Sequence, residues 1–211
     1  MHKSIYRSIC LVCLALITLL FVACTSIPIS SMYSLSKIDP LKADPEQIRV
    51  AIRVNESVNV SAGSAQIQVG FKAEDHNINE EFEFDVQLTN APTLTPKLTR
   101  GALPGDQVTV MSLTPEDART MREFQQRLLN YESEGIKGQG SFGLRLGDLC
   151  LKKALPEEDI PLTLFLKTET NEDYIVFIKT ELHDAFSDID SEVNWLPLCA
   201  EMTGKDAQTK T

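Results

Sequence analysis

The chain has 211 residues, with 30 acidic residues against 20 lysines and arginines, so its formal net charge is −10 at neutral pH. A chain this acidic repels phosphate backbones, which argues against nucleic-acid binding. Its length suits one domain large enough to bury a core.

The first 23 residues have the layout of a secretory signal. Lys3 and Arg7 form a basic start, and an uncharged apolar run follows from Ile9 to Val22. As a helix that run would span about 21 Å, at ~1.5 Å per residue, which is short of the roughly 30 Å hydrocarbon core of a membrane. We therefore predict that residues 1–23 are a removed signal peptide rather than a spanning helix.

The end of this run, Phe21-Val22-Ala23-Cys24, resembles the lipobox of bacterial lipoproteins. In that family the cysteine thiol receives a diacylglyceryl group, and the cysteine becomes the acylated first residue of the mature chain. The resemblance implies lipidation of Cys24 and stable attachment through buried acyl chains. Thr25 follows the cysteine, and in enterobacterial members of the family a residue other than Asp here implies the outer membrane. We expect a lipid-anchored envelope protein, on the outer membrane and facing the periplasm.

Residues 24–47 predict a tether, because they lack strand alternation and contain Pro28, Pro40 and Pro45. Residues 48–200 predict a β-rich globular domain, and residues 201–211 a flexible tail.

Three segments of that domain alternate apolar and polar side chains with a period of two: Ile48 to Val54, Ile67 to Ala73 and Phe82 to Leu88. The pattern is typical of half-buried strands in an antiparallel sheet with one solvated face. Turns are expected at residues 61–63 and 77–80, and a long crossing loop at residues 90–105. Further strands are predicted at residues 107–113, 142–151, 162–168 and 174–182.

One helix interrupts the strands. Thr114 suits the N-cap, Pro115 the first helical position and Gly135 the C-terminal cap. An apolar stripe follows from the spacing of Met121, Phe124, Leu128 and Tyr131. Such a stripe usually packs in the core, although it can also be a partner-binding face.

The order of these elements predicts a mainly β fold, an antiparallel β-sandwich of about seven strands with one inserted amphipathic α-helix. The alternative is an α+β fold, with a single antiparallel sheet and one helix packed on it.

Cys10 and Cys13 leave with the predicted signal, and Cys24 takes the lipid, so the mature chain retains Cys150 and Cys199. Two cysteines in an oxidising compartment predict a Cys150–Cys199 disulfide rather than a metal site.

No motif for catalysis, a cofactor or a metal stands in its required context. Residues 138–143 spell G-x-G-x-x-G, but a helix precedes them and a strand follows, the reverse of a dinucleotide site. The acidic stretch Asp188 to Glu192 lacks the glycine and the final glutamate of an EF-hand. His76 and His183 are far apart in the sequence. We expect neither an enzyme nor a cofactor.

We therefore expect a structural or protein-partner-binding module of the cell envelope, and as the alternative a lipoprotein that binds a soluble ligand. In outline the chain resembles the small sandwich lipoproteins that anchor envelope-spanning secretion machines.

Overall fold

The computed structural model describes residues 42–90, 94–153, 160–169, 173–186 and 196–200. Cys24, the predicted signal, most of the predicted tether, the acidic stretch at 188–192 and the tail therefore lie outside the described residues. Within them, no helix is long and apolar enough to cross a membrane.

The fold is mainly β, and its three sheets are antiparallel. The largest has the order β10-β9-β1-β6-β5, formed by β1 (Arg49–Asn55), β5 (Gln87–Leu88), β6 (Asp106–Ser112), β9 (Pro161–Lys167) and β10 (Ile175–Glu181). The second has the order β4-β3-β7, formed by β3 (Ala65–Ala73), β4 (Ile78–Asp85) and β7 (Gln139–Leu146). The smallest pairs β2 (Val58–Asn59) with β8 (Cys150–Leu151).

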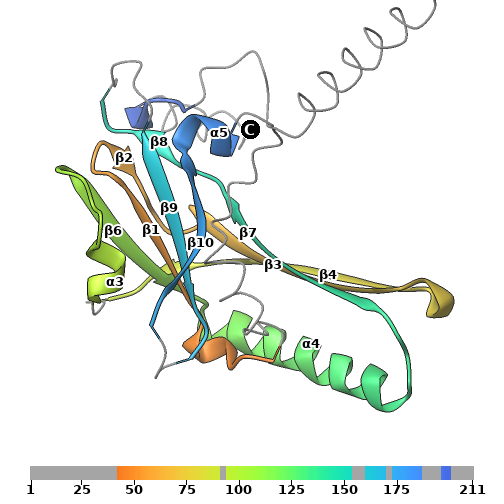
Figure 1. Cartoon of the computed structure of the whole chain (residues 1–211). Helices are drawn as coiled ribbons and strands as arrows, with labels where there is room; N and C mark the ends of the chain where they lie inside the picture. The colour runs from red at the N-terminus through yellow and green to blue at the C-terminus, as the bar shows by residue number, and fades with distance from the viewer. Residues whose placement is uncertain (1–41, 91–93, 154–159, 170–172, 187–195, 201–211) are drawn as a thin grey trace, which may run out of the picture.

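The two larger sheets share one apolar core. Ile52 of β1, Ile67 of β3 and Met121 of the long helix α4 (Pro115–Ser133) are fully buried in the same cluster. The β3–β4 hairpin extends outward from the five-stranded sheet, and α4 lies along that extension (Figure 1). The sequence prediction of a mainly β fold with a helix inserted between strands is confirmed.

The two ends of α4 follow from its sequence. The Thr114 side chain caps the start by accepting a hydrogen bond from the Asp117 amide at 3.0 Å. Gly135 takes a left-handed conformation at φ 75°, which glycine adopts without steric cost. Two hydrogen bonds then close the helix, from the Gly135 amide to the Glu132 carbonyl at 3.0 Å and from the Ile136 amide to the Tyr131 carbonyl at 2.9 Å. This paired arrangement is the Schellman motif.

The second face of β1, expected to be solvated, is buried. The reason is a short helix, α3 (Pro96–Thr99), which forms within the predicted crossing loop at 90–105 and contributes buried Leu98 to that side. Arg53 is only 9% exposed there. Its guanidinium donates to the carbonyls of Leu98 at 3.0 Å and Arg100 at 2.8 Å, and it lies 5.3 Å from the ring centroid of Phe165. The buried guanidinium is thus hydrogen-bonded to backbone carbonyls. The alternation of apolar and polar residues in the sequence could not reveal these partners.

Two further boundaries differ from the expected ones. The turn between β3 and β4 begins earlier than the expected residues 77–80, at η2 (Glu74–His76), and ends at Asn77, whose φ is 54°. The strand expected at 142–151 divides into β7 and β8, because Asp148 takes a left-handed conformation between them.

A disulfide joins Cys150 to Cys199, with a Cα–Cα distance of 5.0 Å, as predicted. It connects β8 to the segment after Pro197, whose carbonyl accepts a hydrogen bond from the Leu151 amide at 2.9 Å. Helix α5 (Leu182–Phe186) follows β10 directly.

Candidate functional site

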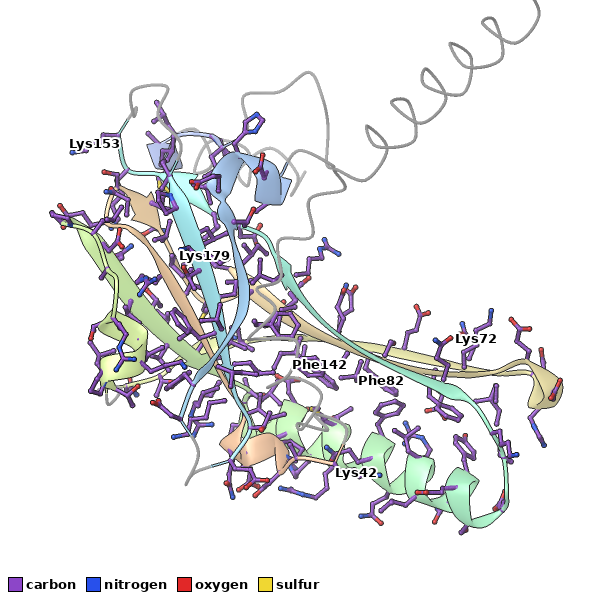
Figure 2. The ribbon with its side chains drawn as sticks, viewed as in Figure 1. Lys42, Lys72, Phe82, Phe142, Lys153 and Lys179 are labelled. Carbon is purple, nitrogen blue, oxygen red and sulfur yellow. A yellow bond between two sulfur atoms is a disulfide. The ribbon has the colours of Figure 1, made fainter. Side chains whose placement is uncertain are left out.

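The aromatic side chains of α4 contact aromatic rings on two strands of the β4-β3-β7 sheet, β4 and β3. The Phe124 ring lies 5.1 Å from that of Phe82 on β4, and the Tyr131 ring stacks 5.5 Å from that of Phe71 on β3. In Figure 2, Phe82 and Phe142 lie between this sheet and α4. These contacts place the helix toward β4, on the side of the sheet away from β7.

A carboxylate fixes the helix on that side. Glu80 of β4 accepts hydrogen bonds from the Tyr131 hydroxyl at 2.7 Å and from Arg127 Nε at 2.9 Å. Burial raises the pKa of Glu80, but these two hydrogen bonds and the positive charge of Arg127 outweigh it, so that this pKa lies below its ordinary value. The same hydrogen bond to Glu80 raises the pKa of Tyr131. Tyr131 therefore donates its hydroxyl proton to Glu80. Together Glu80, Tyr131 and Arg127 form a clasp that joins β4 to α4.

At the start of β7, two glycines leave the sheet face without side chains. Phe71 pairs with Gly140 and Val69 with Phe142, so Gly140 lies on the same face as these apolar residues. Gly138, just before β7, lies so close to Phe71 that an added Cβ would stand 2.3 Å from its Cζ atom. With no side chain at either glycine, the start of β7 leaves space beside α4, whereas Phe142 further along the strand packs against the core.

The result is a groove of about 770 Å³ between α4 and the start of β7. The helix lines it with Gln125, Gln126, Leu128, Leu129 and Glu132. The segment after the helix and β7 add Ile136, Lys137, Gly138 and Gly140, and the remaining lining residues are Phe71 and Lys42. The groove is open to solvent, since Leu129 is 47% exposed.

The end of the predicted tether packs against one end of this groove. Gln125 donates through Nε2 to the Ala43 carbonyl at 2.8 Å. Arg122 pairs with Asp44 at 2.7 Å and with Glu46 of η1 (Pro45–Gln47) at 3.3 Å. Burial raises the pKa of Asp44, but hydrogen bonds from the Glu46 amide and from Arg122 outweigh it and lower this pKa overall. The chain therefore enters the domain directly beside the groove.

The residues singled out from the sequence lie elsewhere. The Cys150–Cys199 disulfide is at β8, and Cys24 is outside the described residues. His76 is at the tip of the β3–β4 hairpin, whereas His183 is in α5, so the fold does not bring the two histidines together (Figure 1). In the described part of the chain, no group of three or more His, Cys, Asp or Glu could hold a metal ion.

The groove itself was missed by sequence reasoning. The G-x-G-x-x-G segment was expected to precede a strand, but from Gln139 onward it is already part of β7. The sequence signal for the groove was Gly140, a residue without a side chain opposite the aromatic Phe71 of the neighbouring strand. Recognising that signal required the pairing of Phe71 with Gly140, which is set by register and not by local sequence.

Comparison with protein-family models, with curated proteins and with solved structures finds no match to this chain.

Proposed function

We propose that the protein is a bacterial lipoprotein, attached through acyl chains on Cys24 to the outer membrane and facing the periplasm. The support is the basic start, the apolar run and the lipobox-like Phe21-Val22-Ala23-Cys24. The disulfide between Cys150 and Cys199 is consistent with an oxidising compartment.

The anchor has a definite chemical test. Mature protein purified from membranes should begin at Cys24 and carry the mass of a diacylglyceryl group with a further acyl chain. Cys24→Ser should leave an unprocessed precursor or a product released from membranes. A wild-type N-terminus at any other residue, or release of the wild type by high salt alone, would refute the anchor, because salt screens charge attraction and not apolar burial.

The groove supports the binding of an apolar ligand as the function of the described domain. Its volume of about 770 Å³ lies within the ~300–1,000 Å³ typical of small-ligand sites, and such sites combine apolar walls with a few polar groups. Among the lining residues that the structure describes, none is Ser, Thr, Cys or His. The polar groups of the lining are therefore the side chains of glutamine, lysine and glutamate.

A protein partner is the second candidate, and the observation that favours it is the edge position of β7. In the described part of the chain β7 pairs on one side only, with β3. An unpaired strand edge beside an apolar groove is a surface to which an extended segment of another protein can add.

Two matched leucine variants test the groove as the ligand site. Leu129 and Leu103 are 47% and 54% exposed, but only Leu129 lines the groove. Photolabelling of the full chain in nanodiscs by a neutral dodecyl diazirine should fall severalfold with Leu129→Asp and stay unchanged with Leu103→Asp. Equal labelling of both variants and the wild type would refute ligand binding in the groove.

A further inference from the structure

The start of the described chain already packs along α4 where the groove begins. Arg122 pairs with Asp44 at 2.7 Å, and Gln125 donates to the Ala43 carbonyl at 2.8 Å. Lys42, one residue earlier in the chain, lines the groove (Figure 2). As the chain is followed back from Asp44 to Lys42, its contacts therefore move forward along α4. A chain that continued in this direction would run through the groove, antiparallel to the helix.

The tether segment that precedes Lys42, residues 29–41, has an apolar residue at every third position. These residues are Ile29, Met32, Leu35, Ile38 and Leu41. A polyproline II helix has three residues per turn, so in that conformation all five would share one edge. Pro40 favours this conformation, because proline fixes its own φ at about −65° and restricts the preceding residue to extended backbone. The spacing is therefore typical of an extended chain with one apolar edge.

The length of the groove matches this spacing. Gln125 and Glu132, which both line the groove, are about 10 Å apart along α4, at ~1.5 Å per residue. Ile38 and Leu41 would be about 9 Å apart in a polyproline II helix, at ~3.1 Å per residue. From the Gln125 end, Leu41 would reach Leu128, and Ile38 would reach the far end of the groove.

The groove offers an uncovered apolar wall to such an edge. Leu128, Leu129 and Ile136 line it together with Phe71, and the Leu129 side chain is 47% exposed in the described structure. Packing an apolar edge on this wall removes both surfaces from water, which is favourable. The tether segment is also part of the same chain, so its effective concentration at the groove is high and a weak contact is sufficient.

We propose that the tether segment docks in the groove as an intramolecular ligand, antiparallel to α4, with Leu41 beside Leu128 and Ile38 between Glu132 and Ile136. This docking goes beyond the proposed ligand binding, since it requires the groove and not an external ligand. Its consequence rests on that binding: the tether segment and an apolar ligand exclude each other. A ligand therefore enters only by displacing the segment that connects the domain to its proposed anchor.

Paired cysteines test the docking itself. In the full chain, Ile38→Cys should form a disulfide with Glu132→Cys severalfold faster under mild oxidation than with Asn130→Cys. Asn130 is the matched control, because it is also exposed on α4 but does not line the groove. Leu41→Cys should prefer Leu128→Cys to Glu132→Cys. Equal rates with Glu132→Cys and Asn130→Cys would overturn the docking, and a reversed preference of Leu41→Cys would overturn its direction.

Charges on the tether segment test the exclusion of a ligand. Ile38→Asp with Leu41→Asp should release the segment and raise labelling of the groove by the neutral dodecyl diazirine severalfold. Ser34→Asp with Ser36→Asp adds the same charge away from the apolar edge and should leave labelling unchanged. Labelling of the wild type that neither pair alters would overturn the inference and leave ligand binding intact. Selective disulfide formation without any label in the groove would support the docking and refute ligand binding alone.

Discussion

Glu80 shows how one side chain positions the groove. It lies on β4, yet it accepts hydrogen bonds from Tyr131 and Arg127, which are one helical turn apart on α4. Arg127 also packs over the Phe82 ring, at 5.5 Å from its centroid. Because these contacts all lie on the β4 side, the helix cannot move over β7 without losing a charge-assisted hydrogen bond and an aromatic contact.

Replacement of Glu80 should therefore change the pH dependence of stability. Its pKa is lowered by folding, so its carboxylate stabilises the native state above its ordinary value of 4.5, and this contribution is lost as the pH falls through the lower folded value. Glu80→Gln should cost about 1 kcal/mol at pH 7 and progressively less below about pH 4.5. Urea unfolding of both proteins between pH 7 and pH 3 measures this difference.

Glu81→Gln serves as the control, since Glu81 is exposed and the substitution removes the same charge. A Glu80→Gln difference that stays constant with pH, or that Glu81→Gln reproduces, would show that Glu80 does not clasp the helix.

At the scale of the element, α4 has two sides with different tasks. Phe124 is fully buried against Phe82 in the common core. Leu129, five residues further on, is half-exposed in the groove wall. The sequence left open whether the apolar stripe of α4 packs in the core or forms a binding face. Met121 and Phe124 of the stripe are fully buried in the core, whereas Leu128 of the same stripe lines the groove beside Leu129.

Truncating each side of α4 should separate these tasks. Phe124→Ala should lower the free energy of unfolding by ~3–5 kcal/mol, because it leaves a cavity in a packed core. Leu129→Ala, on the same helix, should lower it by less than about 1 kcal/mol, because that side chain is already half in solvent. Chemical denaturation monitored by circular dichroism compares the two. Equal losses would mean that Leu129 is part of the core and that no groove separates α4 from β7.

The elements that could be predicted from sequence are those whose signals are local. Thr114, Pro115 and Gly135 determine the ends of α4, and the alternation from Ile67 to Ala73 fixes the dry and wet faces of β3. The burial of Arg53 could not be predicted, because its partners are carbonyls 45 and 47 residues away. The groove could not be predicted for the same reason: it needs Gly140 opposite Phe71, a long-range pairing.

At the scale of the whole molecule, the disulfide ties the chain beyond β10 back to β8. Cys150 and Cys199 are 49 residues apart, and between them lie β9 and β10, which complete the five-stranded sheet. Closing a loop of that length stabilises a fold by roughly 4 kcal/mol in the chain-entropy model. That is a large share of the ~5–15 kcal/mol by which domains are usually stable.

Loss of this disulfide should affect stability in a non-additive way. Cys150→Ser and Cys199→Ser should each lower the free energy of unfolding by about 2–5 kcal/mol, and the double variant should be no less stable than either single variant. Urea denaturation of the three variants, with reduced wild type as a reference, measures the effect. Alkylation of two thiols in unreduced native protein would contradict the bond itself.

The anchor and the groove belong together in the proposed function. The chain enters the domain at Lys42, which lines the groove, and the proposed lipid is on Cys24, eighteen residues earlier. As the tether predicted from the sequence, this stretch would span roughly 20–25 Å, at about 5–6 Å × √n. The groove would then work close to the membrane surface.

The most direct measurement of the central claim is to locate the photolabel. The full chain in nanodiscs is irradiated with the neutral dodecyl diazirine, and the modified residues are identified by mass spectrometry. We expect the label on Leu128, Leu129 or Ile136, which line the groove. Labelling confined to exposed leucines outside the groove, Leu88, Leu94 and Leu103, would contradict the assignment of the α4–β7 groove as the binding site.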